Sequence, residues 1–255
     1  MKKRIAMILS LCVLVLGGCR YHFNVSSGLS SFIYEDSDRY TMGGASLHDT
    51  IENIEIEWLS GKVQVAEHDK NTIEFTEESN KKLDKDTTLY YWLNGKTLYI
   101  QFCRSGKWNF DGLEKDLILW LPKDIHLNEL KIDSVSAVIN AGNVKAAKVE
   151  LNSVSGETSL IGGEIKEIKG DFVSGDVFVA CRTAPEKMEI DTVSGAVALF
   201  LAETADFTLD YETVSGDLSS DISFKKSGDD YICGDGTYQY EIDTVSGDVS
   251  IKIQD

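Results

Sequence analysis

A Val-Ser-Gly tripeptide that recurs through the second half of the chain constrains the fold more than any other feature. Its six copies have serines 19, 19, 20, 21 and 31 residues apart. A unit that returns at a near-constant interval is typical of stacked repeats, in which each unit buries its apolar side against its neighbours. The last interval predicts an insertion that loops out around residues 228–236. The copies are Val135-Ser136-Ala137, Val154-Ser155-Gly156, Val173-Ser174-Gly175, Val193-Ser194-Gly195, Val214-Ser215-Gly216 and Val245-Ser246-Gly247, with a degenerate earlier copy at Leu59-Ser60-Gly61.

Each copy breaks a period-two alternation of apolar and polar residues, which indicates a corner in the chain. Ile242, for example, is followed three residues later by the motif valine, and the alternation resumes in the opposite parity at Val249. In a parallel β-solenoid the motif valines point inward and stack at about 4.8 Å. In an antiparallel β-meander, Ser-Gly is a two-residue hairpin turn. We favour the solenoid because a meander needs more strands than one array usually holds. Antiparallel pairing across Ser194-Gly195 would exclude it.

Residues 51–128 show strand patterns with less regularity. Apolar residues alternate with glutamates over residues 54–58, as in a half-buried strand. Asn94-Gly95 lies between two apolar runs and predicts a hairpin with a type I′ turn. No stretch after residue 20 has a convincing helical period. We therefore expect an all-β chain, with an irregular antiparallel β region at the N-terminal end of the array.

Residues 1–18 predict a signal peptide. A basic start, Met1-Lys2-Lys3-Arg4, precedes an apolar run that is too short to span a bilayer. Two glycines then precede Cys19, and this arrangement resembles a bacterial lipoprotein signal, in which the cysteine thiol receives a diacylglyceryl group. The resemblance implies lipidation at Cys19 and an extracytoplasmic protein anchored to a bacterial membrane; ordinary secretion is the alternative. Residues 19–50 then predict a flexible tether.

The charge balance argues against nucleic acid as a partner. The chain has 42 acidic and 25 basic residues, a net charge of −17, and loss of residues 1–18 removes three basic residues and leaves −20. Cys103, Cys181 and Cys233 remain in the mature chain outside the predicted lipid site. Their spacing matches no metal or redox motif, so one disulfide at most can form and buried thiols are the alternative.

Acidic residues recur at fixed places in the repeat. If the coils stack, these residues form outward columns of like charge, which solvent or a divalent cation such as Ca²⁺ would relieve. The alternative is a solvated acidic surface without metal. The position two before the motif valine holds Asp133, Asn152, Asp171, Asp191, Glu212 and Asp243, and the position after the motif glycine holds Glu157, Asp176, Asp217 and Asp248. The calcium candidates are Asp171, Asp191, Asp243, Asp176, Asp217 and Asp248.

The sequence offers no convincing catalytic constellation. Six equivalent serines indicate a turn role, because a nucleophile needs one unique neighbouring base. The histidines show no paired ligand spacing and all lie outside the Val-Ser-Gly repeats, which favours solvent-facing or locally hydrogen-bonded roles. The acids recur instead of forming one pair, so a single glycosidase-like site is disfavoured. We expect no enzyme activity and no cofactor.

The strand that ends in Leu121-Pro122-Lys123, followed by units such as residues 242–249, resembles the bacterial putative-adhesin domain of unknown function. The similarity covers residues 51–253. It implies a short N-terminal β region joined to Gly-rich β-solenoid repeats on an exported or membrane-anchored protein. It also implies a surface or envelope role, including envelope-stress sensing in some members. It carries over no catalytic residues.

These observations predict a domain order and a function class. We expect a signal peptide at 1–18, a tether at 19–50, a β region at 51–128 and the repeat array at 129–255, with 51–255 forming one continuous domain. The predicted function is a non-enzymatic cell-envelope lipoprotein that presents a binding surface, as an adhesin or a sensor. Alternatives are a glycan-active enzyme on a β-helix and an acidic surface trap for cationic peptides.

The expected partners follow from the same pattern. They are the membrane, through the lipid anchor, and an envelope glycan, protein or cationic peptide. A second copy of the chain is a further candidate, because the last predicted strand, Val249–Ile253, leaves an open edge at the end of the array.

Overall fold

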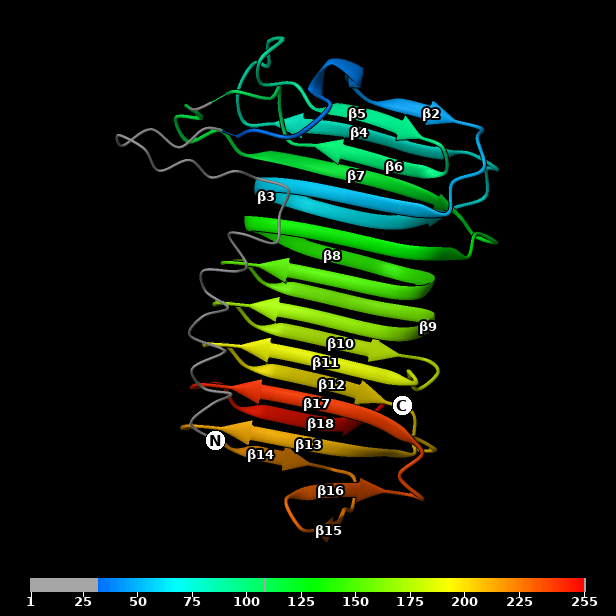
Figure 1. The fold of residues 1–255 in the computed structure, drawn as a ribbon, viewed down its shortest axis with the longest axis vertical. Helices are drawn as coiled ribbons and strands as arrows, with labels where there is room; N and C mark the ends of the chain where they lie inside the picture. Colours follow the sequence, from blue (N-terminus) through cyan, green and yellow to red (C-terminus); the bar gives the residue numbers. More distant parts are fainter. Residues whose placement is uncertain (1–31, 108, 255) are drawn as a thin grey trace.

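The computed structural model describes residues 32–107 and 109–254, which form an all-β protein (Figure 1). The described residues contain one 3₁₀ turn, η1 (Ser37–Arg39), and no helix in them has the length and apolar character needed to cross a membrane. The strands are β1 (Thr41–Met42), β2 (Ala45–Leu47), β3 (Asn53–His68), β4 (Ile73–Ser79), β5 (Tyr90–Asn94), β6 (Thr97–Gln101), β7 (Lys115–Pro122), β8 (Leu127–Ser153), β9 (Thr158–Phe172), β10 (Val177–Cys181), β11 (Lys187–Thr192), β12 (Val197–Leu201), β13 (Phe207–Thr213), β14 (Leu218–Ser220), β15 (Lys225–Ser227), β16 (Asp230–Cys233), β17 (Tyr238–Thr244) and β18 (Val249–Ile253).

The repeat array is a parallel β-solenoid. β11 pairs in parallel with β9 and β17, and β12 pairs in parallel with β10 and β18. β11 and β12 flank Ser194-Gly195, and each takes its partners from neighbouring coils. The antiparallel meander is therefore wrong, and the predicted all-β solenoid is confirmed.

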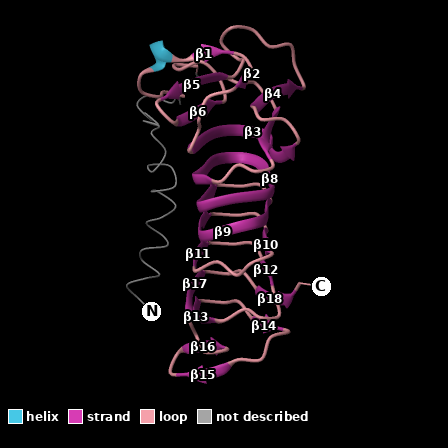
Figure 2. Ribbon diagram, turned by 90° about the vertical axis from the view of Figure 1, so that its right-hand side faces the viewer, coloured by secondary structure: helices cyan, strands magenta, loops and turns pink. Residues whose placement is uncertain are grey.

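Each coil contributes one strand to each of two sheets, which Figure 2 shows edge-on. We call the sheet that precedes the Val-Ser-Gly corners the charged face: it contains β11, β17 and β13, with residues 53–58, 129–134, 147–153 and 166–172. The sheet that follows the corners is the neutral face: it contains β10, β12, β18 and β14, with residues 61–68, 137–142 and 158–162. Apolar side chains from both sheets meet between them, such as Ile190 and Val197, and form one continuous core.

The motif glycines are required by the stacking of the coils. Gly195 has a φ of 123°, and a Cβ atom there would overlap the carbonyl oxygen of Gly175 in the coil above. The same close approach recurs at Gly156 and Gly175. An L-residue with a side chain fits neither this backbone angle nor this space.

The motif serines join successive coils. The Ser174 hydroxyl donates to the Val154 carbonyl oxygen at 3.1 Å, and the Ser174 backbone N–H donates to the same oxygen at 3.0 Å. Equivalent hydroxyl bonds run from Ser155 to Val135 at 3.3 Å and from Ser246 to Val193 at 3.3 Å. The predicted turn role of the serines is confirmed.

The predicted inward ladder of motif valines is wrong. Val135 is 37% exposed and Val214 is 54% exposed, whereas the residue before each motif valine in the middle coils is buried, as at Thr192. The alternation therefore runs unbroken to that residue, and the corner begins at the valine. The predicted solenoid is correct, but the inward-pointing motif valine that was one reason for predicting it is not observed.

The coils do not stack in sequence order at the C-terminal end. β17 lies between β11 and β13, and β18 lies between β12 and β14, so the last coil in sequence is inserted between two earlier ones. The C-terminus accordingly lies beside β18, away from the end of the stack (Figure 1). The expected open edge at Val249–Ile253 is wrong, because β18 has a neighbour on each side.

Both ends of the stack are covered by antiparallel strands. The predicted loop around residues 228–236 is part of a β-hairpin, in which β16 pairs with β15 and with the last strand of the charged face, β13. Lys225 and Lys226 are exposed on the outermost strand β15, where charge discourages pairing with a further strand. The insertion is thus an end cap.

At the other end, part of the predicted tether belongs to the folded domain. Phe32 and Tyr34 are each 4% exposed, β1 pairs with β5, and β2 pairs with β4. Residues 32–50 are therefore not a free linker, because their aromatic side chains pack into the antiparallel region that contains β1, β2, β4 and β5, which we call the N-terminal cap. Residues 1–31 lie outside the described residues.

The region 51–128 is only partly antiparallel. β3 pairs in parallel with β6, β7 and β8, and Ser60 lies in register with Ser136, so the degenerate copy Leu59-Ser60-Gly61 is the first true corner. The solenoid thus begins at β3, before residue 129. The hairpin β5–β6 is confirmed, but Asn94 is its last paired residue and Gly95 supplies the positive φ of 61°, so the turn lies one residue later than predicted.

Candidate functional site

Outward side chains of the charged face pair with one another across coils. Lys131 Nζ lies 2.8 Å from Glu150 Oε1, and Lys169 Nζ lies 3.1 Å from Glu189 Oε1. Burial opposes ionisation of Glu150, but hydrogen bonds from Lys131 and Lys148 lower its pKa to about 2. Further pairs are Lys148–Glu129 at 2.9 Å and Lys187–Glu167 at 3.5 Å. Many of the charged side chains on this face are therefore paired with one another within the protein.

The predicted acidic column exists beside the charged-face lysines and glutamates. Asp171 lies in register with Asp191, and Asp191 with Asp243. The column is not a solvated row, since Asp133 is 4% and Asp243 is 5% exposed. Burial, together with the charges of Asp171 and Asp243, raises the pKa of Asp191 to about 7. Burial also raises the pKa of Asp133 and of Asp171, so burial disfavours the charged form at several places in this column.

The second acidic row hydrogen-bonds to backbone across the corners. Asp176 Oδ1 accepts from the N–H of Ala196 at 2.9 Å, and Asp248 Oδ1 accepts from the N–H of Asp217 at 3.0 Å. Within residues 32–107 and 109–254, no three His, Cys, Asp or Glu side chains come together in a way that could hold a metal ion. Calcium binding stays a prediction without support from this geometry for Asp171, Asp191, Asp243, Asp176, Asp217 and Asp248.

The described histidines lie apart from one another. His68 Nε2 is 2.6 Å from the Thr72 carbonyl oxygen, and His126 Nε2 is 3.5 Å from Glu164 Oε2 on the surface. His48 is exposed. These positions fit the predicted local roles, while His22 and the lipidation candidate Cys19 lie outside the described residues.

The three cysteines beyond the predicted lipid site are buried free thiols in the structure. Burial raises the pKa of Cys103 and of Cys181 to about 12, so neither forms a thiolate readily. The Cys233 thiol donates to the Ala205 carbonyl oxygen at 3.0 Å. Of the two alternatives drawn from the sequence, buried thiols are the correct one.

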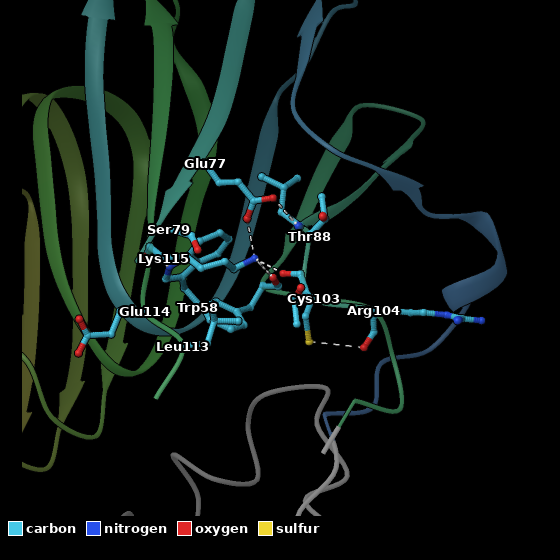
Figure 3. Close-up of polar contacts among 12 residues, drawn as sticks. Trp58, Glu77, Ser79, Thr88, Cys103, Arg104, Leu113, Glu114 and Lys115 are labelled. Carbon is cyan, nitrogen blue, oxygen red and sulfur yellow. Dashed lines mark hydrogen bonds and ion pairs between the residues drawn. The ribbon is translucent and has the colours of Figure 1, made fainter. Parts of the chain in front are cut away.

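A buried lysine holds the N-terminal cap to the first coil (Figure 3). Lys115 is fully buried, and its ammonium group contacts Glu77 Oε2 at 2.5 Å and the Thr87 carbonyl oxygen at 2.8 Å. The rings of Trp58 and Phe102 flank it at 4.9 and 4.3 Å from their centroids. Burial lowers the pKa of Lys115, while Glu77 opposes that shift. Because the ammonium group is enclosed, this cluster has a structural role.

The neutral face differs chemically from the charged face. Its outward positions on successive strands carry Gln64, Asn140, Ser159 and Phe178, which lie in one register column. The side chains of Gln64, Asn140 and Ser159 make no hydrogen bond to another described residue and are half-buried. Amides and hydroxyls of this kind both donate and accept hydrogen bonds, so this column is available to a ligand.

A groove of about 550 Å³ lies over β3, β8 and β9 on the neutral face. It is hollow because Ala66 and Gly142 present little or no side chain between Ile161 and Lys123. Ile161 is 42% exposed there. The remaining lining residues are Gln64, Val65, Glu67, Asn140, Ala141, Asn143 and Ser159.

A second groove, of about 500 Å³, lies where the chain passes from the neutral face to the charged face, and its lining includes residues 126–128, 146–147 and 164–166. Its charged residues are exposed and paired on the surface: His126 with Glu164 at 3.5 Å and Lys166 with Glu186 at 3.9 Å. Its floor is formed by small residues such as Ala146 and Ala184. It lacks the run of neutral polar side chains found on the neutral face.

Sequence reasoning missed the neutral face. It singled out the acidic residues, which recur at repeated positions, and gave no role to the outward-facing residues that follow each corner. A usable signal was present in the sequence, because most alternate residues after the corners are uncharged, with Lys62 and Lys252 as exceptions, while most of those before the corners are charged. What the sequence could not show is that these residues stack into one column, because that depends on inter-coil register.

Comparisons with known proteins agree with this architecture. A family model described as Toastrack DUF4097 matches residues 121–252, which include most of the repeat array. A crystal structure of a putative cell adhesion protein from Clostridium sporogenes ATCC 15579 has a TM-score of 0.51 and 13% identity, covering 84% of this chain and 100% of that chain. This likeness shows the fold alone.

Other matches are more distant. A putative adhesin from Bacteroides fragilis NCTC 9343 has a TM-score of 0.37 and 11% identity over 84% of this chain and 97% of that one. A putative lipid binding protein from Parabacteroides distasonis ATCC 8503 has a TM-score of 0.35 and 17% identity over 85% and 97%. No protein with a curated description matches the chain by sequence.

Proposed function

Because the chain belongs to the Toastrack DUF4097 family, we propose that it is a non-enzymatic binding protein of the bacterial cell envelope, with the neutral face as its binding surface. One observation carries the proposal. Lysines and glutamates on the charged face pair with one another, whereas Gln64, Asn140 and Ser159 on the neutral face have no partner among the described residues. Polar groups that are half-desolvated and unused within the fold suit recognition of another molecule.

The placement of the acidic residues supports a binding role over a catalytic one. A glycosidase needs two carboxylates that face one substrate. Asp171, Asp191 and Asp243 stand in a column on the charged face, and none of them lines either groove. The first groove has one acidic lining residue, Glu67, and the two in the second groove, Glu164 and Glu186, each pair with a neighbouring basic side chain. These aspartates therefore lie between neighbouring coils and do not face a substrate bound in a groove.

The lipid anchor forms part of the same proposal. Cys19 is the residue that would receive the diacylglyceryl group, and two or more acyl chains would hold the protein stably on a membrane. Phe32, the first described residue, lies in the N-terminal cap, 13 residues after Cys19. Intact-mass analysis of the N-terminal peptide from native membranes tests this part: a mass without acyl chains on Cys19 would contradict it.

The binding proposal is tested with residues 20–255 and isolated bacterial envelopes. We expect co-sedimentation that is lost on Phe178→Asp, which places a charge on the neutral face, and is kept on Lys187→Asp, which changes the charged face. Thermal melting of each variant controls for folding. Equal retention of both variants, or no retention of the parent protein, would overturn the proposal.

A further inference from the structure

The groove on the neutral face indicates the chemistry of its ligand. Gln64, Asn140 and Ser159 each lie one strand apart, so their amide and hydroxyl groups are spaced at about 4.8 Å along the solenoid axis. Each of these groups both donates and accepts hydrogen bonds. A matching ligand carries neutral groups that also do both, repeated along its length.

The charges at the end of the groove are already neutralised. Glu67 pairs with Lys145 at 3.6 Å, and Lys123 pairs with Asp69 at 2.6 Å. An ionic ligand would have to compete with these pairs, whereas a neutral ligand would not. The lining therefore favours an uncharged molecule over a phosphate, a carboxylate or a basic peptide.

Apolar side chains accompany the neutral polar column. Ile161 is exposed at the groove, and further along the axis Phe178 and Phe200 form a tilted pair with ring centroids 4.8 Å apart. Both rings are half-buried on the neutral face, and Lys252 Nζ lies 5.5 Å from the centroid of Phe200. Such rings provide flat apolar surface beside the hydrogen-bonding groups. The ligand thus has an apolar face as well as hydroxyl-like groups.

A peptide strand fits this surface less well. Strand addition requires an open sheet edge. The groove lies over β3, β8 and β9, whose neutral-face segments have hydrogen-bonded strands on both sides. Recognition there must use side chains that project from the sheet, which here are small, neutral or aromatic.

We propose that the groove binds a neutral glycan chain laid along the solenoid axis. Hydroxyl groups of the glycan bond to Gln64, Asn140 and Ser159, and the apolar faces of its rings pack on Ile161 and on the Phe178–Phe200 pair. The proposal rests on the proposed function, since it names the ligand class of the neutral face. A glycan whose units are spaced close to the roughly 4.8 Å between strands would present one sugar unit to each coil.

The test uses residues 20–255 with maltohexaose, cellohexaose and chitohexaose as probes. We expect at least one of these neutral hexasaccharides to bind in calorimetry and to shift the side-chain amide NMR signals of Gln64 and Asn140. Binding is expected to weaken at least tenfold in Asn140→Ala. It is expected to disappear in Gly142→Leu, which fills the groove.

The variants are chosen to leave the fold intact. A Cβ atom at Gly142 would meet only the Val65 carbonyl oxygen, at 3.4 Å, which is ordinary contact. Gln64→Ala and Gln239→Ala form a matched pair, because Gln239 is an exposed amide on the charged face. We expect Gln64→Ala to weaken binding and Gln239→Ala to leave it unchanged. If Gly142→Leu does not fold, Asn140→Ala still decides the result.

Failure of this inference is distinguishable from failure of the proposed function. If envelope binding depends on the neutral face but none of the hexasaccharides binds, the glycan inference is wrong and the binding function stands. Loss of envelope binding after protease treatment of the envelopes would also overturn it, because the partner would be a protein. Hexasaccharide binding that Gly142→Leu and Asn140→Ala leave intact would place the site elsewhere and overturn it.

Discussion

Lys115 Nζ lies 2.5 Å from Glu77 Oε2, and the two side chains are 0% and 7% exposed. Glu77 Oε1 also accepts from the backbone N–H of Leu89 at 2.7 Å. The pair therefore joins β7, β4 and the segment before β5 inside the N-terminal cap. A buried charge is tolerated here because hydrogen bonds and two aromatic rings replace the water that it loses.

Removing the lysine is expected to destabilise the cap strongly. Lys115→Ala leaves the carboxylate of Glu77 buried without its cation, at a cost of about 3–5 kcal/mol in the free energy of unfolding. Lys96→Ala is the matched control, because Lys96 pairs with Glu52 at the exposed surface and such pairs contribute about 1 kcal/mol or less. Urea unfolding measures both. Equal losses in the two variants would show that the buried pair has no special role.

The motif glycines are expected to be intolerant of any side chain. Gly195→Ala places a methyl group against the Gly175 carbonyl oxygen and keeps an unfavourable positive φ, so we expect a loss of more than about 3 kcal/mol. Gly95→Ala is the control, since Gly95 also has a positive φ but nothing lies near its Cβ position; its expected cost is about 1 kcal/mol. Comparable unfolding midpoints for the two variants would contradict the stacking argument.

The contribution of Asp191 to stability is expected to fall as the pH rises toward 7. The carboxyl of Asp191 has its folded pKa raised from 3.8 to about 7, so the folded state binds its proton more tightly than the unfolded state does. Stability from this proton is fully present below about pH 4 and is lost as the pH rises to about 7. The groups that face Asp191 are Asp171 on β9, Asp243 and Glu241 on β17, and its strand neighbour Glu189.

Replacing Asp191 by a neutral residue tests whether its charged form destabilises the protein. Asp191→Asn is expected to stabilise the protein at pH 8 by about 1–2 kcal/mol, a figure reduced from the full shift because the carboxyl is partly exposed. The variant is also expected to flatten the change in melting temperature between pH 4 and pH 7. Asp116→Asn, an exposed carboxyl on β7, is the control. A lower melting temperature for Asp191→Asn at pH 8 would show that the column stabilises the fold when charged.

The outward direction of the motif valines gives a further prediction. Val214→Asn at a 54% exposed site is expected to change the free energy of unfolding by less than about 0.5 kcal/mol. Val197→Asn, which buries a polar amide at a fully enclosed position, is expected to cost about 3 kcal/mol or more. Thermal melting of the two variants distinguishes them. A severe loss in Val214→Asn would restore the inward ladder that the structure excludes.

The sequence by itself determined the class of fold and the local geometry. The 19–21-residue spacing, the alternation of residues and the glycine at all but one of the corners specified an all-β stack, because strand alternation and turn-forming glycines are local features of the sequence. Acidic residues at a repeated position likewise implied a column. The candidate groove could not be predicted in the same way, because Gln64, Asn140 and Ser159 belong to three different coils.

The tertiary structure decided which coil lies beside which. Gly247 packs against Gly195, and Gly216 packs against Gly247, although Gly216 comes first in sequence. The corners have nearly the same sequence, so the local pattern does not determine which two coils lie next to each other. That choice depends on long-range contacts, such as the hairpin β15–β16 that closes the stack on β13. The same long-range register brings the neutral side chains into one groove and buries the acids that the sequence placed in solvent.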